Sequence, residues 1–155
     1  MARESDPTAS IGFLLGDANR LFRQRFDAAA AEAGLGLTPG EARTLGYVSK
    51  YEGARQTPIA EAMGVDPMTL VAFLDRLEGL GLVVRFPDPT DRRAKVIRLT
   101  ETSAPVVAKI RQVAEAVRNE ALEGLDEAER DVLRDLLRRI IAQLSAPDTV
   151  SETAS

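Results

Sequence analysis

Residues 66–100 limit the folds open to this chain more than any other stretch of it. The stretch begins with Asp66 and Pro67, a side-chain acceptor followed by proline at the first helical position, where a missing N–H costs nothing. Apolar residues then recur at three- and four-residue spacing from Leu70 to Leu77, and Gly79 and Gly81 follow. This pattern predicts a short amphipathic helix that ends at the glycines.

A β-hairpin is predicted directly after this helix. Residues 82–84 and 96–99 are rich in β-branched side chains, which favours two strands. The turn-forming segment between them places three cations at its tip, Arg92, Arg93 and Lys95. A helix followed at once by a cationic hairpin is the layout of a winged helix. Such a helix can enter the major groove of DNA while the tip reaches phosphates or the minor groove.

Two further helices are predicted before this stretch. Thr38 and Glu41 have the spacing of a capping box and start a helix that ends near residues 51–53. Thr57 and Pro58 start a short helix that ends before Gly64. This short helix and the one from Asp66 form a helix-turn-helix. A plain helical hairpin is the alternative, which the hairpin directly after it disfavours.

Long helices are predicted at both ends of the chain. One runs from Ser10 to about Ala33, a second from a Thr100 cap to about Leu122, and a third from a capping box at Asp126 to about Leu144. The apolar stripe expected on the second is Val106, Ile110, Val113, Ala114, Val117 and Ala121.

The last helix has seven aliphatic residues in the thirteen positions 132–144, which would leave a large apolar patch on a monomer. We therefore predict that the first and last helices of two copies pack into a symmetric interface. For the first helix, ordinary core packing is the alternative. The predicted interface residues are Ile11, Leu14, Leu15, Leu133, Leu137, Ile140, Ile141 and Leu144.

The predicted fold class is mainly α with a small β-hairpin wing (α+β), a winged helix-turn-helix with a helical dimerisation arm. Its 155 residues fit one domain, or one lobe with such an arm. Residues 35–100 form the winged helix-turn-helix, and residues 10–34 and 101–144 the dimerisation region. The polar segments 1–9 and 145–155 are expected to be disordered.

Composition excludes several kinds of chemistry. The chain has no Cys and no His, so it has no disulfide, no thiolate sensor, no Ser–His or Cys–His nucleophile pair and no zinc site built on imidazole or thiolate. No Asp-rich metal loop or glycine-rich phosphate loop is present, and we predict no enzyme, no metal and no cofactor. Because the start of the chain is unlike a signal peptide and no apolar run approaches ~18–20 residues, a cytoplasmic protein is expected, away from membranes.

Charge is distributed unevenly along the chain. The net charge of −4 argues against a general nucleic-acid binder. Residues 76–100, however, hold six cations and three anions, which leaves 14 cations and 21 anions elsewhere. An acidic body with a basic hairpin is compatible with DNA binding in one particular pose.

The same stretch resembles the MarR (multiple-antibiotic-resistance) family of bacterial regulators. The resemblance extends from roughly residue 11 to residue 144, and its central feature is an Asp-x-Arg hairpin followed by Leu-Thr. The residues that carry it are Leu77-Glu78, Gly81-Leu82-Val83, Arg85, Asp91-Arg92-Arg93 and Leu99-Thr100. It implies a homodimeric, sequence-specific winged-helix DNA-binding protein, usually a repressor that a small ligand releases from a pseudo-palindromic operator.

The resemblance implies that Arg93 reaches into the minor groove and that Asp91 orients it, with Arg92 and Lys95 on phosphates. Asp88 and Asp91 flank these cations, and an acid two residues before an arginine can hold its guanidinium by a charge-assisted hydrogen bond. The DNA-binding residues predicted in all are Pro67, Met68, Thr69, Val71, Ala72, Asp75, Arg76, Arg85, Asp91, Arg92, Arg93 and Lys95.

The recognition helix has few groups that can read bases. Only Thr69 and Arg76 can donate hydrogen bonds, and Val71 and Ala72 stand where members of the family commonly have Ser, Thr or Arg. Specificity from groove shape and wing is one alternative. A protein-interaction module that has lost operator binding is another. Asp75 would repel phosphate unless Arg76 or Arg85 pairs with it.

The resemblance also implies an effector, often an aromatic or lipophilic acid, between the dimer arm and the winged lobe. No motif marks its site. Residues of suitable type on the first two helices are Phe22, Arg23, Phe26, Tyr47 and Tyr51, each of which also fits a core or solvent position.

Overall fold

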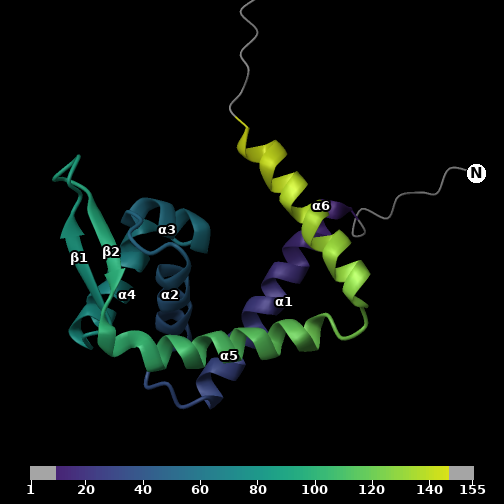
Figure 1. Ribbon diagram of the computed structural model, residues 1–155, viewed down its shortest axis with the longest axis horizontal. Coiled ribbons are helices and arrows are strands. Elements are labelled where there is room, and N and C mark those ends of the chain that lie inside the picture. Colours follow the sequence, from purple (N-terminus) through teal and green to yellow (C-terminus); the bar gives the residue numbers. More distant parts are fainter. Residues whose placement is uncertain (1–9, 147–155) are drawn as a thin grey trace, which may run out of the picture. The chain divides into compact units, whose positions relative to one another are not determined.

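The computed structural model of the protein describes residues 10–146, whose helices and strands are labelled in Figure 1. The elements are α1 (Ile11–Glu32), α2 (Pro39–Lys50), α3 (Gln56–Met63), α4 (Pro67–Gly79), β1 (Val83–Pro87), β2 (Lys95–Leu99), the 3-10 turn η2 (Glu101–Ser103), α5 (Ala104–Ala121) and α6 (Glu127–Ser145). The fold is mainly helical with one two-stranded antiparallel hairpin, which confirms the predicted class. The predicted disordered segments lie outside the described residues, except for Ser145, the last residue of α6, and Ala146, its C-cap.

The chain divides into two compact units, residues 1–118 and 119–155. In the first, α2, α3, α4 and the hairpin surround a common core, and α1 packs on α2. Its largest fully buried apolar side chains come from α2, α3, α4 and the hairpin: Leu45, Val48, Ile59, Leu70, Leu74, Leu77, Val83 and Ile97. The three- and four-residue spacing from Leu70 to Leu77 therefore fixes which face of α4 points outward.

The hairpin is longer than its β-branched residues indicate. β1 pairs with β2 from Val83 opposite Leu99 to Pro87 opposite Lys95. A third extended segment joins its edge, because Arg55 forms an isolated bridge with Val96. There the Gly53 N–H donates to the Ile97 carbonyl at 2.8 Å, and the Ile97 N–H donates to the Ala54 carbonyl at 2.9 Å. The linker between α2 and α3 is thus anchored to the hairpin.

Most helix starts follow the sequence. Thr38 and Glu41 form the expected capping box, Asp126 and Glu129 form another, and Asp66 accepts the Thr69 N–H. The prediction for Thr100 is wrong. Its hydroxyl donates to the Gly81 carbonyl at 2.6 Å, so the side chain joins the two ends of the hairpin, and α5 begins only after η2.

The buried face of α5 matches the predicted stripe in part: Ile110 and Val117 are buried, and Val106 and Val113 are half-buried, but Ala114 and Ala121 are exposed. Val107, Ile110 and Val117 are buried, at spacings of three and seven residues. Ala114 is exposed because it borders a cavity described below, and Ala121, also exposed, belongs to the second unit.

The second unit contains the turn after α5 and the helix α6. Arg130 holds this turn by donating to the Leu122 and Leu125 carbonyls at 2.8 and 3.0 Å. No residue of α6 is buried: Leu133, Ile141 and Leu144 are exposed, and Leu137 and Ile140 are half-buried. Ile11, Leu14 and Leu15 on α1 are likewise exposed. Among residues 10–146, no helix is long and apolar enough to cross a membrane.

Candidate nucleic-acid interface

The outward face of α4 is the face that the sequence predicts. Thr69 is half-buried, and the others of the set are exposed: Pro67, Met68, Val71, Ala72, Asp75 and Arg76. The Thr69 N–H and hydroxyl both donate to the Asp66 carboxylate, at 2.9 and 2.6 Å, and these bonds lower the pKa of Asp66. Arg76 lies 3.5 Å from the buried Glu41. Both potential base readers of the helix therefore already have intramolecular partners.

Arg85 pairs with the two acids beside this face. It donates to Asp75 at 2.5 Å and to Glu78 at 2.6 Å, and only 20% of its side chain is exposed. The possible repulsion between Asp75 and a phosphate is thereby reduced. Arg85 connects β1 to α4, and it has two carboxylate partners in the free protein.

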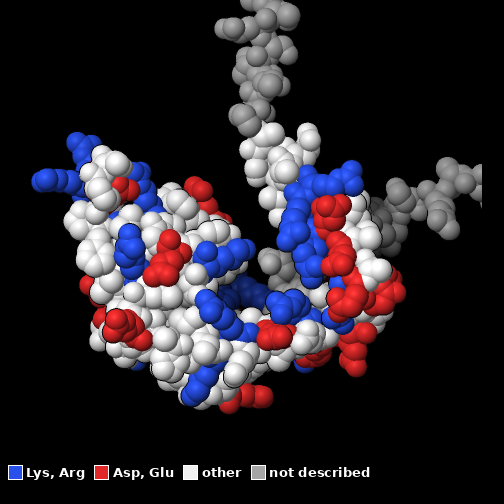
Figure 2. Space-filling view, viewed as in Figure 1, with Lys and Arg blue, Asp and Glu red and all other residues white. Residues whose placement is uncertain are grey.

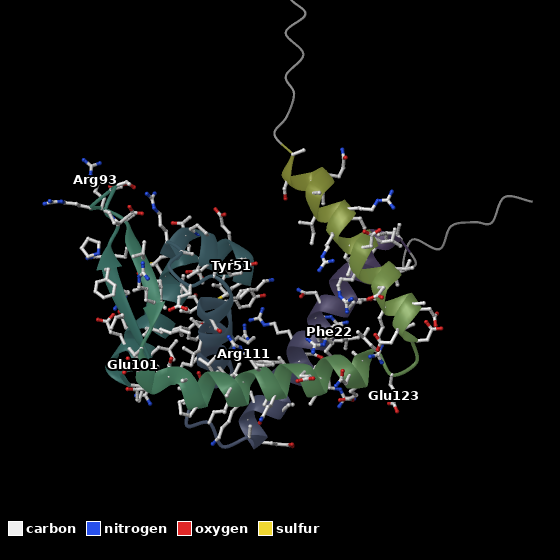
Figure 3. All side chains as sticks on the ribbon, viewed as in Figure 1. Phe22, Tyr51, Arg93, Glu101, Arg111 and Glu123 are labelled. Atoms are coloured by element: carbon white, nitrogen blue, oxygen red, sulfur yellow. The ribbon has the colours of Figure 1, made fainter. Side chains whose placement is uncertain are left out.

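The hairpin tip carries Arg92, Arg93 and Lys95, all exposed, and Figure 2 shows these cations at the end of the hairpin. Figure 3 shows Arg93 projecting from the tip, away from the helices of the lobe. The Asp91 carboxylate accepts the backbone N–H of Arg93 at 3.0 Å. Asp91 therefore shapes the turn instead of holding the Arg93 guanidinium, which forms no ion pair with any of residues 10–146.

Asp88 has a different partner from the one expected. It is only 8% exposed and accepts the Arg55 Nε–H at 2.6 Å, and the N–H and hydroxyl of Thr90 at 2.7 Å each. The Thr90 hydroxyl and Arg55 hold the pKa of Asp88 well below its usual range. The idea that Asp88 holds an arginine of the tip is thus wrong. No local motif marks Arg55 as the partner of Asp88, because Arg55 and Asp88 are thirty-three positions apart in the sequence.

The first unit also contains a cavity of about 530 Å³ between α1, α2, the end of α3 and α5. Phe22, Arg23, Phe26 and Tyr47 line it, whereas Tyr51 does not, because its ring stacks on Tyr47 with centroids 6.3 Å apart. Phe22 and Arg111 are labelled in Figure 3. The full lining is Asn19, Phe22, Arg23, Phe26, Arg43, Gly46, Tyr47, Lys50, Glu61, Ala62, Met63, Gly64, Ile110, Arg111, Ala114 and Val117.

Four cations and one acid face this cavity: Arg23, Arg43, Lys50 and Arg111, and Glu61. Arg43 pairs with Asp27 at 2.8 Å, and Arg111 donates to the Ser49 hydroxyl at 2.8 Å. An apolar floor with cations around it suits an anion with an apolar body. Among residues 10–146 no cluster of acids could hold a metal ion. Sequence reasoning missed Arg111, since its helix was assigned to dimerisation.

Known proteins resemble the chain over most of its length. The family model described as the MarR family matches residues 37–95. A Thauera aromatica protein, named as a candidate transcriptional regulatory protein for the hcr operon, is 35% identical over 118 residues, which is 76% of this chain and 71% of that protein. The crystal structure of a MarR-family transcriptional regulator from Rhodococcus sp. RHA1 has 31% identity and a TM-score of 0.70, covering 84% of this chain and 91% of that one.

Two structures of the repressor CouR are also similar. One, bound to a 23-mer DNA duplex, has 28% identity and a TM-score of 0.68, covering 91% of this chain and 99% of its own. The other, from Rhodococcus jostii RHA1 and bound to p-coumaroyl-CoA, has 26% identity and a TM-score of 0.70, covering 92% and 96%.

The helix-turn-helix, the outward face of α4 and the cationic hairpin together define a winged-helix DNA-binding protein. The similar proteins identify the family within this class. The chain belongs to the MarR family of transcriptional regulators, and it is not an enzyme.

Proposed function

We propose that this protein is a homodimeric repressor that binds a pseudo-palindromic operator through α4 and the hairpin and is released by an aromatic or lipophilic anion. The observation that carries the proposal is the hairpin tip, where three exposed cations stand on an acidic chain. As a regulator of chromosomal DNA it would act in the cytoplasm.

The acids near the tip do not cancel its charge. Asp88 is turned inward to Arg55, and Asp91 is bonded to the backbone. A narrow minor groove, whose potential is more negative than elsewhere, attracts an extended arginine such as Arg93. The exposed apolar residues of α4, Met68, Val71 and Ala72, suit contact with thymine methyl groups. The DNA complex of CouR supports this use of the fold.

The decisive test starts by selecting bound genomic fragments with the purified protein. On a selected operator, Arg93→Ala should weaken binding by roughly 1–3 kcal/mol. Affinity should fall steeply between low and high salt, because a dimer displaces counterions from several phosphates. Arg20→Ala, an exposed arginine of α1 paired with Asp17, is the matched control and should leave the affinity unchanged. Wild-type affinity in Arg93→Ala would exclude the hairpin as a DNA reader.

The cavity supports the choice of effector. Its cations outnumber its acids four to one, and three of its apolar lining residues are aromatic. Because CouR binds p-coumaroyl-CoA, we propose an aromatic carboxylate or its CoA thioester as the ligand class. Calorimetry with p-coumarate, p-coumaroyl-CoA and free coenzyme A separates the acid, the thioester and the nucleotide part. If none of them binds or lowers operator affinity, this ligand class is excluded.

A second candidate is a protein-interaction module without specific operator binding. The engagement of Thr69 with Asp66 favours it, since α4 then offers few free donors to bases. The fragment selection separates the two functions: enrichment of particular sequences supports the repressor, and equal recovery of all fragments supports the module.

A further inference from the structure

We propose that Arg55 is a positioning residue for DNA binding, which locks the base of the hairpin loop to the helix-turn-helix so that Arg93 is presented to the groove. The inference rests on the proposed function and adds a residue that no sequence motif of this chain marks. Arg55, Asp88 and Thr90 are called the wing latch below.

The backbone of Arg55 is fixed at two elements. It occupies the N-cap position of α3, where its side chain makes no capping bond. At the same time it bridges Val96 of β2, next to the hydrogen bonds between residues 53–54 and Ile97. The residue therefore lies where the helix-turn-helix meets the hairpin, and its side chain is available to reach the loop.

The side chain closes this junction. Its Nε donates to one oxygen of Asp88 at 2.6 Å, and Nη2 lies 3.3 Å from the Thr90 hydroxyl. The other Asp88 oxygen accepts both the N–H and the hydroxyl of Thr90. The Asp88 N–H in turn donates to the Ala94 carbonyl at 2.9 Å, across the loop that carries the cations. Asp88, almost fully buried, thus binds Arg55 at the start of α3 through one oxygen and Thr90 of the loop through the other.

A latch at this place has a reason in the physics of hairpins. A two-stranded hairpin is marginally stable alone, and this one is longer than the rest of the lobe covers, because Phe86 and Pro87 at its outer end are exposed. A loop that swings freely loses more conformational entropy when it binds DNA, which weakens binding. Holding the loop to α3 fixes the distance between the tip and the helix-turn-helix before DNA arrives.

The sign of one substitution distinguishes this role from a simple charge effect. Asp88→Asn removes a negative charge close to the operator, so electrostatics alone would tighten binding. The latch predicts the opposite, an affinity about tenfold lower, because the asparagine loses the charge-assisted bond to Arg55. Affinity equal to or higher than that of the wild type would overturn the proposal.

A double-mutant cycle tests whether Arg55 acts through Arg93. Arg55→Ala should weaken operator binding about tenfold in the wild type, but by less than about twofold when Arg93 is already alanine. If Arg55 contacts a phosphate itself, the two effects add, the salt slope falls by about one, and the positioning role is rejected. Arg98→Ala, an exposed cation of β2, is the matched control and should be additive with Arg93→Ala.

Two measurements separate the outcomes. Thermal unfolding of each variant shows whether the lobe is folded at the assay temperature. If Arg55→Ala is unfolded there, Arg55→Lys takes its place, because lysine keeps the positive charge. Lysine lacks the planar fork that reaches both Asp88 and Thr90, so the latch still predicts weaker binding. Binding by the wild type with no effect of the latch variants refutes the latch alone, whereas a wild type that selects no fragment refutes the proposed function.

Discussion

At the scale of single residues, Asp88 is the most constrained acid of the hairpin. Three hydrogen bonds stabilise its charged form and depress its pKa in the folded state. A depressed pKa contributes stability that is present above the unfolded value of about 3.9 and lost as the pH falls toward the folded value.

We therefore expect the difference in unfolding free energy between the wild type and Asp88→Asn to be constant from about pH 5 to pH 8 and to shrink below about pH 4. Urea unfolding across this range measures it. Asp135→Asn, an exposed carboxylate of α6, controls for an added surface amide. A difference that instead changes between pH 6 and pH 8 would show that Asp88 titrates near neutrality.

Gly40 is required by packing. A Cβ at this position would lie 2.5 Å from the Phe73 ring of α4, closer than side chains approach one another. Gly40→Ala should therefore destabilise the protein by about 1–3 kcal/mol, although alanine favours a helix. Gly46→Ala in the same helix is the matched control, because its Cβ would meet Ile110 at an ordinary 3.5 Å. Thermal unfolding should show the control at least as stable as the wild type.

The residues that the sequence predicted correctly act locally. The capping boxes at Thr38 and Asp126 and the cap at Asp66 involve partners three positions away, so a short motif contains the whole interaction. The pair Arg55–Asp88 joins residues thirty-three positions apart. Thr100 has the right residue type for a cap, yet its hydroxyl donates to Gly81, nineteen positions earlier. Only the folded arrangement shows such partners.

At the scale of elements, Arg85 connects the recognition helix to the hairpin. Arg85→Ala should lower the stability by about 1 kcal/mol, as expected for a partly exposed ion pair. It should also weaken operator binding roughly tenfold, since Asp75 is left uncompensated on the face that we propose binds DNA. Fluorescence anisotropy with a labelled operator measures the second effect.

A compensating variant checks the cause. Combining Arg85→Ala with Asp75→Asn removes the unpaired charge and should restore most of the lost affinity. If the double variant binds as weakly as Arg85→Ala, Arg85 contacts DNA directly, as the sequence analysis predicted, and its pairing with Asp75 is secondary.

Sequence periodicity located every α-helix of residues 10–146, but it missed the 3-10 turn η2 and some boundaries. β1 extends to Pro87 although Arg85, Phe86 and Pro87 lack the β-branched pattern, because their partners on β2 supply the pairing. The cavity was only half predictable. Four of the five candidates line it, because they are residues of suitable type on α1 and α2. Arg111 and Glu61, which also line it, come from α5 and α3. Which helices line the same cavity depends on tertiary packing, which the sequence alone does not show.

At the scale of the whole molecule, the exposed apolar residues of α1 and α6 lead to a prediction of assembly. Each of the two helices carries several exposed aliphatic residues, among them Ile11 (69% exposed) on α1 and Ile141 (61%) and Leu144 (82%) on α6, and exposed apolar patches mark interaction sites. We expect the protein to sediment as a dimer at micromolar concentration. Leu133→Asp with Ile141→Asp should produce monomers that lose most operator affinity, because two half-sites can no longer be bound together.

Leu80→Asp is the control for this experiment. Leu80 is 41% exposed at the end of α4, outside the predicted interface, so its variant should remain a dimer. A wild type that sediments as a monomer would contradict both the interface and the two-fold binding of an operator.

Helix α3 is only eight residues long, and its two ends have different neighbours. One end of α3 borders the cavity through Glu61, Met63 and the following Gly64. At the opposite end, Arg55 donates a hydrogen bond to Asp88 of the hairpin loop. Such a helix is a rod of about 12 Å. We therefore expect that a ligand that displaces the cavity end of α3 also shifts Arg55 and, through Asp88, the hairpin loop that carries Arg93.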